Sequence, residues 1–256
     1  MSKKELTSVD LGRRGLHMNQ LKDGFRFGTD TVLLSWFTAC AIKDEGVRAL
    51  ELGANCGACS FLLYGRRPKT LIDSVEIDAD AYDVLKDNIA LNGLEGSITA
   101  HKGDVRDLPK EIRDKQYDAV FMNPPFFTER TGPVSSRTGR CEINGTLSDF
   151  IKAGASRLVP SGGIMTLVMT SSRTDELIEL MGANGIKPIR FMSVHPFSDK
   201  NAEMVLVAGK KTNTKTNLEI MPPLILNERD GETGKVFITS RLKDIYEKEQ
   251  EDCFIW

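Results

Sequence analysis

Long apolar runs are absent from this sequence, and its net charge is small. No stretch reaches the roughly 18 apolar residues that a membrane-spanning helix needs, and the polar residues Met1 to Glu5 precede no apolar signal core. We therefore expect a cytoplasmic protein without membrane contacts. The formal net charge of −2 argues against a surface covered in positive charge for bulk nucleic-acid binding, but it allows a local basic patch.

Cysteine and histidine are also scarce. The five cysteines are odd in number and unpatterned, which fits free thiols better than a disulfide framework. Cys56 and Cys59 form a C-x-x-C pair at the start of a helical pattern, so a thiol oxidoreductase is one alternative. No second C-x-x-C exists, and the three histidines show no ligand spacing, so we expect no metal site.

The chain is long enough for one large domain. It has 256 residues, of which 40% are hydrophobic, and it shows no internal repeat or second domain. Residues 1–28 are polar and glycine-rich, and we interpret them as an N-terminal arm or small hairpin outside the core. Residues 29–210 carry the main domain, and residues 211–256 are interpreted as a C-terminal extension packed on it.

Strand and helix patterns alternate along the main domain. Short apolar runs predict strands over 47–52, 71–75, 97–101, 117–122, 164–169, 189–194 and 204–208. Helical patterns lie between them, over 31–42, 60–64, 78–92, 146–159 and 175–184. Thr29-Asp30 is a plausible cap of the first helix, and Thr146 or Ser148 of the fourth. This alternation predicts an α/β fold with a mostly parallel sheet covered by helices on both faces.

Polar residues that suit a nucleotide follow the first three strands. Gly53 to Gly57 separates a strand from a helix, and such a loop lets the backbone approach a ligand while the helix N-terminus adds donors. Glu76 ends the second strand, where a ribose-binding carboxylate is expected. Asp104 follows the third strand, as an acceptor for a cofactor adenine or as a mere turn residue. Ligands of such sheets bind outside the carboxyl ends of the strands.

The stretch Asn123-Pro124-Pro125-Phe126 follows the fourth predicted strand. Its prolines donate no N–H and hold Asn123 extended, so the loop presents that side chain. The Asn123 side-chain oxygen and the Pro124 carbonyl can accept the two hydrogens of a conjugated amine such as that of adenine, which favours a nucleophilic nitrogen. Phe126 can stack on the ring and orient it. The alternative is an ordinary strand-to-loop turn.

A long polar loop, about 127–145, comes next and suggests a lid or substrate loop. It carries Arg130, Arg137 and Arg140, which are candidates for nucleic-acid contacts. Other candidates are Arg13, Arg14, Arg66, Arg67 and Lys69. Each of these side chains can equally be an ordinary solvated charge.

In this order, Glu51-x-Gly53-x-Asn55-x-Gly57, Glu76, Gly103-Asp104 and Asn123-Pro124-Pro125-Phe126 resemble the class I S-adenosylmethionine-dependent methyltransferases with an amino-group acceptor. The match extends from about Leu11 to Tyr246. Further stretches are similar to the bacterial enzymes that methylate adenine N6 beside the anticodon of a valine tRNA; they are Phe27-Gly28-Thr29-Asp30, Arg140-Cys141-Glu142-Ile143, His195-Pro196-Phe197-Ser198 and Leu218 to Leu224. The resemblance implies a Rossmann-like, seven-stranded methyltransferase domain over 29–210.

The resemblance also implies roles for residues. The cofactor S-adenosyl-L-methionine, with S-adenosyl-L-homocysteine as product, would be held by Thr29, Asp30, Glu51, Gly53, Asn55, Gly57, Glu76 and Asp104. Asn123, Pro124 and Phe126 would hold the target base, and Phe127, Arg130, Arg137 and Arg140 would line the mouth for RNA. Asn55 departs from the family, which has its middle glycine there, although asparagine tolerates a left-handed backbone.

We therefore expect an N6-adenine tRNA methyltransferase that acts on the anticodon loop, requires no metal and is a monomer or homodimer. Alternative acceptors are another planar amine, such as a guanine N2 in ribosomal RNA or a glutamine side chain of a protein, because Asn-Pro-Pro with a following aromatic residue serves all of them. A non-catalytic module that binds the cofactor or RNA is the alternative from another class.

Overall fold

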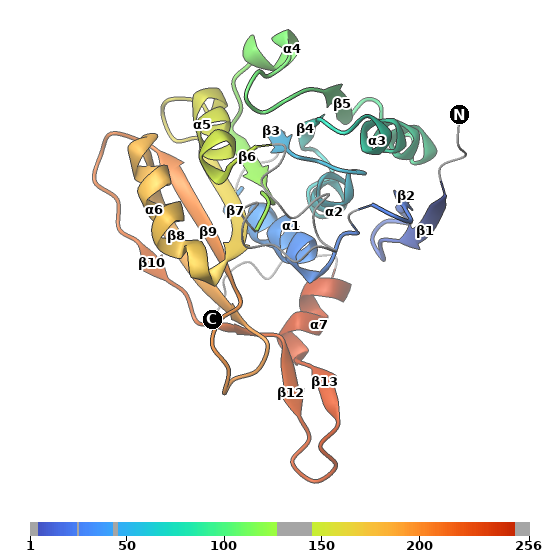
Figure 1. Ribbon diagram of the computed structural model, residues 1–256, viewed down its shortest axis with the longest axis vertical. Coiled ribbons are helices and arrows are strands. Elements are labelled where there is room, and N and C mark those ends of the chain that lie inside the picture. Colours follow the sequence, from blue (N-terminus) through green and yellow to red (C-terminus); the bar gives the residue numbers. More distant parts are fainter. Residues whose placement is uncertain (1–4, 25, 43–45, 127–144, 249–256) are drawn as a thin grey trace.

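The protein is described by a computed structural model that covers residues 5–24, 26–42, 46–126 and 145–248 (Figure 1). Its centre is a sheet whose seven main strands are β3 (Arg48–Leu52), β4 (Leu71–Glu76), β5 (Ile98–Lys102), β6 (Ala119–Met122), β7 (Ile164–Thr170), β8 (Ile186–His195) and β9 (Met204–Lys211). The helices around it are α1 (Thr29–Ala41), α2 (Ala58–Arg66), α3 (Ala79–Leu91), α4 (Lys110–Arg113), α5 (Leu147–Arg157), α6 (Thr174–Ala183) and α7 (Ser240–Glu247).

The sheet has the predicted mostly parallel topology. Its strands run in the order β8-β9-β7-β6-β3-β4-β5, and β9 alone among these seven is antiparallel to its neighbours. Two short strands, β10 (Glu219–Ile220) and β11 (Leu224–Ile225), pair with the outer side of β8, so the sheet has nine strands and not the expected seven. They cover an edge that would otherwise expose unpaired backbone groups.

Helices cover both faces of the sheet, which explains why the central strands β6 and β7 are almost continuously apolar. One core cluster contains buried side chains of α1, α2, α3 and α7, and the other contains those of α4, α5 and α6. Figure 1 shows the two groups on opposite sides of the strands. The α/β fold class is thereby confirmed. No helix in the described ranges is long and apolar enough to cross a membrane.

The N-terminal segment forms the small antiparallel hairpin of β1 (Leu6–Asp10) and β2 (His17–Leu21). The prediction that it lies outside the core was wrong, because Met18 is only 1% exposed and belongs to the main cluster. The Asn88 side chain of α3 anchors the hairpin, donating to the Asn19 carbonyl at 2.8 Å and accepting from the Asn19 N–H at 2.7 Å.

Two buried arginines hold the end of α7 to the body of the domain. Arg13 and Arg66 both donate to the carbonyl of Ile245, at 2.6 and 2.7 Å, and Arg13 also donates to the carbonyl of Lys248. They satisfy carbonyls at the end of α7 that have no partner within the helix. These two residues were candidates for a nucleic-acid patch, and burial rules that out.

Two neighbouring arginines also have structural partners. Arg14 donates to the Gly65 carbonyl and Arg67 to the Ala39 carbonyl, at 2.9 and 2.8 Å. Beyond this region, the hairpin of β12 (Asn227–Arg229) and β13 (Val236–Ile238) projects from the body at the bottom of Figure 1.

The start of α1 differs from the prediction. Thr29 and Asp30 lie within its first turn, and the N-cap is Gly28, which has no side chain to cap with. A carboxylate in the first turn is nevertheless favourable at the positive end of the helix dipole. The cap of α5 is Thr146, as predicted, in a reciprocal capping box with Asp149.

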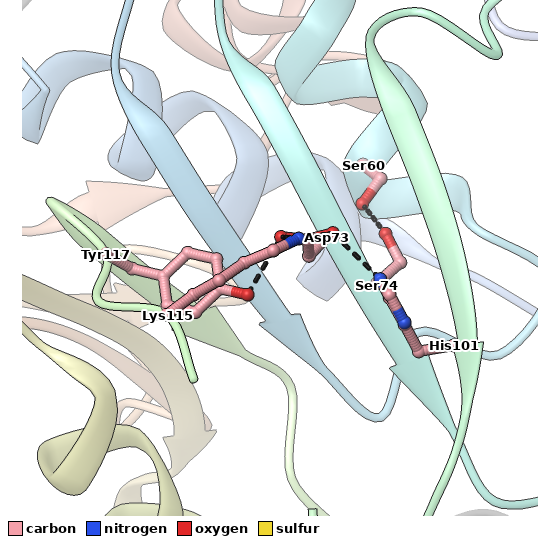
Figure 2. Close-up of polar contacts among 6 residues, drawn as sticks. All are labelled: Ser60, Asp73, Ser74, His101, Lys115 and Tyr117. Carbon is pink, nitrogen blue, oxygen red and sulfur yellow. Dashed lines mark hydrogen bonds and ion pairs between the residues drawn. The ribbon is translucent and has the colours of Figure 1, made fainter. Parts of the chain in front are cut away.

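Asp73, in the middle of β4, is the centre of a buried polar network on the α5 side of the sheet (Figure 2). It lies 2.8 Å from His101 Nε2, and it accepts hydrogen bonds from Lys115 at 2.9 Å and Tyr117 at 2.8 Å. Burial raises the pKa of Asp73, but the hydrogen bonds from these three side chains outweigh it and lower the pKa to about 2. Asp73 thus ties the segment before β6 to two other strands.

Replacing this carboxylate should destabilise the fold in a pH-dependent way. Because its folded pKa is below the ordinary value of 3.8, ionised Asp73 stabilises the protein above pH 3.8, and this contribution is lost as the pH falls towards about 2. Urea unfolding of Asp73→Asn at pH 7 should show a loss of about 2 kcal/mol. The loss should be smaller near pH 3. The control Asp87→Asn, on the exposed side of α3, should leave the free energy of unfolding unchanged at both pH values. An equal loss at both pH values would contradict this role.

Candidate active site

A cleft of about 580 Å³ opens at the carboxyl edge of the parallel strands. The segments that follow β3, β4, β5 and β6 form its floor, and the N-terminal hairpin and the start of α1 close one side. This volume is typical of sites for small molecules and cofactors. Of the predicted site residues, eight that the structure describes line it; they are Asp30, Glu51, Gly53, Asn55, Glu76, Asn123, Pro124 and Phe126. Phe126 is half-buried and packs against both core clusters.

The loop between β3 and α2 needs three left-handed residues. Gly53, Asn55 and Gly57 have φ angles of 74°, 49° and 95°, so Asn55 adopts the conformation that asparagine tolerates. Gly57 does not line the cleft: a Cβ there would lie 2.5 Å from Leu85 Cδ1. Its left-handed φ and its close packing against Leu85 of α3 and Phe61 of α2 explain this glycine.

Asn55 joins the loop to the next strand. Its N–H donates to Glu76 Oε2 at 2.7 Å, and its side-chain oxygen accepts from the N–H of Cys56 at 2.6 Å. The other oxygen of Glu76 accepts from the N–H of Asp78, also at 2.7 Å. Each carboxylate oxygen has a second lone pair, so Glu76 is held in place and can still accept from a ligand.

Two carboxyl groups in the cleft have raised pKa values. Burial raises the pKa of Glu51 to about 8, only partly offset by the hydrogen bond from Ser60. Burial also raises the pKa of Glu76, and the backbone hydrogen bonds that this carboxylate accepts lower it only in part. Perturbed acids in a cleft are typical of functional sites, and here they favour a ligand that brings positive charge or hydrogen-bond donors.

Asn123 follows β6 and points its amide along the cleft wall. Its Nδ2 donates to Asp30 Oδ2 at 3.1 Å and to Thr31 Oγ1 at 3.4 Å. On the far side of the loop, Arg173 donates to the Pro125 carbonyl at 3.4 Å while its guanidinium pairs with Glu176. The proline corner is therefore held from both sides, and Asn123 is presented to the cleft as its sequence predicts.

Besides Gly57, two further predicted cofactor residues do not line the cleft. The Thr29 hydroxyl is exposed and bonds with the Tyr246 hydroxyl of α7 at 3.0 Å. Asp104 is absent from the cleft lining, and its carboxylate accepts from Arg106, which lowers its pKa. The expected contacts of these two with a cofactor are not supported by their positions. The predicted substrate residues Phe127, Arg130, Arg137 and Arg140 lie outside the described residues.

The N-terminal hairpin adds cleft residues that the sequence analysis missed. Met18 and Gln20 both line the cleft, and Gln20 Oε1 is a buried acceptor without a hydrogen-bond partner in the described part of the chain. An unpartnered buried acceptor in a cleft wall suits a ligand that donates. Met18 and Gln20 share the inner face of β2, but apolar and polar residues do not alternate in the sequence of this strand, so no sequence signal placed Gln20 at the cleft.

The two cysteines of the C-x-x-C pair are buried at the cleft wall and form no disulfide within the described residues. Burial, the largest cause, raises the pKa of the Cys59 thiol well above its ordinary value, whereas reactive thiols have lowered pKa values. This disfavours the oxidoreductase alternative. Within the described ranges, no three histidine, cysteine, aspartate or glutamate side chains are grouped so as to hold a metal ion.

Comparisons with known proteins agree with this geometry. The curated tRNA1(Val) (adenine(37)-N6)-methyltransferase of Dyadobacter fermentans is 25% identical over 86% of this chain and 90% of its own length. A predicted O-methyltransferase from Agrobacterium tumefaciens superposes with a TM-score of 0.65, at 21% identity over 84% of this chain and 96% of that one. The geranyl diphosphate C-methyltransferase of Streptomyces coelicolor, solved with S-adenosyl-L-homocysteine, has a TM-score of 0.51 at 12% identity, covering 69% of this chain and 79% of that one.

At these identities the two solved structures bear on the fold alone. The model of the methyltransferase small domain family matches residues 22–182, which is more than half of the chain and includes the cleft residues from Asp30 to Phe126. The protein is therefore an enzyme of the methyltransferase small domain family.

Proposed function

We propose that this methyltransferase uses S-adenosyl-L-methionine to methylate the N6 amine of an adenine in tRNA, at an anticodon-loop position of the 37 type. One observation carries the proposal: Asn123 and Phe126 share a single cleft with Glu51 and Glu76, so an amine and a methyl donor fit side by side. The curated relative from Dyadobacter, which carries that activity in its name, supports the choice of acceptor.

The cleft residues fit the donor. Gly53 has no side chain at the floor, and the buried, partly free acceptors of Glu51, Glu76 and Gln20 suit the ammonium and hydroxyl groups of such a molecule. When bound, S-adenosyl-L-methionine supplies a methyl group on a positively charged sulfur. The protein's part is to bind it, orient it and exclude water.

The Asn-Pro-Pro-Phe corner acts on the acceptor. An amine conjugated to adenine is a weak nucleophile, because its lone pair is delocalised. Asn123 Oδ1 and the Pro124 carbonyl accept its two hydrogens, which favours a nitrogen with an available lone pair, and Phe126 stacks on the base. Bases of a single-stranded loop can be splayed out into such a site. Partner and location follow from this proposal: a tRNA substrate and a place in the cytoplasm.

The proposed function is tested with labelled donor and total RNA, followed by digestion to nucleosides. We expect label in N6-methyladenosine of tRNA. Asn123→Ala should lower the turnover rate by about 100-fold or more, while the donor dissociation constant from titration calorimetry stays within about threefold. Label in N2-methylguanosine of ribosomal RNA, or only in protein, would instead select another planar amine as acceptor, and equal loss of turnover and donor affinity would contradict the role of Asn123.

Donor binding should release a proton. With a pKa of about 8, Glu51 holds its proton near pH 7, and a cationic ligand beside it favours the ionised form. Donor affinity should therefore rise with pH up to about 8, and level off above it. At pH 7, calorimetry in phosphate and in Tris should give different binding enthalpies, consistent with release of up to one proton.

Two matched variants test whether the released proton comes from Glu51 or from elsewhere in the protein. Glu51→Gln should remove the buffer dependence, and Glu95→Gln, in an exposed turn, should keep it. Identical enthalpies in both buffers for the unmodified enzyme would show that no cation lies beside Glu51.

A further inference from the structure

The orientation of the Asn123 amide decides what it can do. An asparagine side chain has an accepting oxygen and a donating nitrogen, and a half-turn about its last bond exchanges them. Only the oxygen can accept a hydrogen from an amine. A wrongly turned amide would present its own hydrogens to the target base and oppose the reaction.

Asp30 stands where it can fix this orientation. Its Oδ2 accepts from Asn123 Nδ2 at 3.1 Å, and its Oδ1 accepts from the backbone N–H of Thr31 at 2.8 Å. Both oxygens are therefore used as acceptors, and Asp30 is only 7% exposed. The Thr31 hydroxyl, 3.4 Å from Asn123 Nδ2, adds a second acceptor on the same side.

We propose that Asp30 is a positioning residue: it holds the nitrogen of the Asn123 amide against α1, so that Oδ1 faces the cleft to accept from the target amine. This inference rests on the proposed function. It assigns Asp30 a different role from the one that the sequence resemblance implies, which is contact with S-adenosyl-L-methionine.

The surroundings hold Asp30 itself in place. A Cβ at Gly28 would lie 3.2 Å from Asp30 Oδ1, so a side chain at position 28 would crowd the carboxylate. The backbone contact with Thr31 comes from the first turn of α1, an element packed against α2 and β7. The orientation of Asn123 is thereby fixed by a rigid part of the fold.

The substitution Asp30→Asn gives a specific expectation. If the oxygen of the introduced amide accepts from Thr31 N–H, its nitrogen faces Asn123, which must then turn its own oxygen away from the cleft. The reacting amine would then meet the NH₂ group of Asn123, a hydrogen-bond donor, in place of its accepting oxygen. Asp30→Ala removes the partner without imposing a wrong orientation, so it should be less harmful although it is less conservative.

The test compares turnover of these two variants with labelled donor and tRNA. Asp30→Asn should lower the turnover rate by about 100-fold and Asp30→Ala by about tenfold, with the donor dissociation constant within about threefold in both. A residue with a merely structural role, or one that binds the donor, would give the opposite order or a loss of donor affinity. Asp87→Asn is the matched control and should behave as the unmodified enzyme.

Rescue provides an independent check. In the double variant Asp30→Asn with Asn123→Asp, the introduced amide donates to one oxygen of the introduced carboxylate, and the other oxygen faces the cleft as an acceptor. We expect this exchange to regain at least about tenfold of the turnover that Asp30→Asn loses, a coupling that a double-mutant cycle measures. The proposal would be overturned if the double variant regained no turnover and Asp30→Ala lost more turnover than Asp30→Asn.

Hydrogen exchange of the Asn123 side chain tests the inference in the unmodified protein, so this test does not depend on whether the variants fold. In ¹⁵N-asparagine-labelled enzyme, with Asn123→Ala used to assign the signal, the Asn123 side-chain NH₂ should be protected from hydrogen exchange in the unmodified protein; an unprotected NH₂ overturns the inference. If the unmodified enzyme methylates no adenine, the proposed function fails. If it does, but neither Asp30 variant differs from the control, only the positioning role fails.

Discussion

Parallel strands covered on both faces leave only their ends for polar chemistry. In this protein the two core clusters fill both sides of the sheet, and a buried charge inside them requires partners, as Asp73 has in His101, Lys115 and Tyr117. The carboxyl edge is where the backbone turns away and side chains such as Glu51, Glu76 and Asn123 can meet. The candidate sites for the methyl donor and for the amine are thus brought together because the covered middle of the sheet admits charged groups only with partners.

The fold was predictable because its signals are local. The strands begin and end within a few residues of the predicted positions, since short apolar runs bounded by turns leave few alternatives. The errors arose from contacts distant in sequence. Arg13 and Arg66 look like surface charges until α7 packs beside them, and β10 and β11 are too short to show a pattern of their own.

The cleft was predictable to a similar degree. Glu51, Glu76 and Asn123 follow from their positions at strand ends, which the topology brings together. Gly57 and Asp104 were predicted from the glycine loop and from a strand end as well as from the resemblance, but one is explained by packing on Leu85 and the other pairs with Arg106. Gln20 was missed because only the docking of the N-terminal hairpin on α3 places it at the cleft.

The junction between Arg13, Arg66 and the end of α7 affects how the chain matures on the ribosome. Domains begin to fold from the N-terminal side during synthesis, but the carbonyls of Ile245 and Lys248 are translated more than two hundred residues after Arg13. Until then, both guanidinium groups lack these acceptors, and the surface of α1 around Trp36 lacks its cover. A nascent chain halted before α7 should therefore be a ligand for chaperones, and a premature stop codon in this stretch should lower the amount of folded enzyme even though every cleft residue has been made.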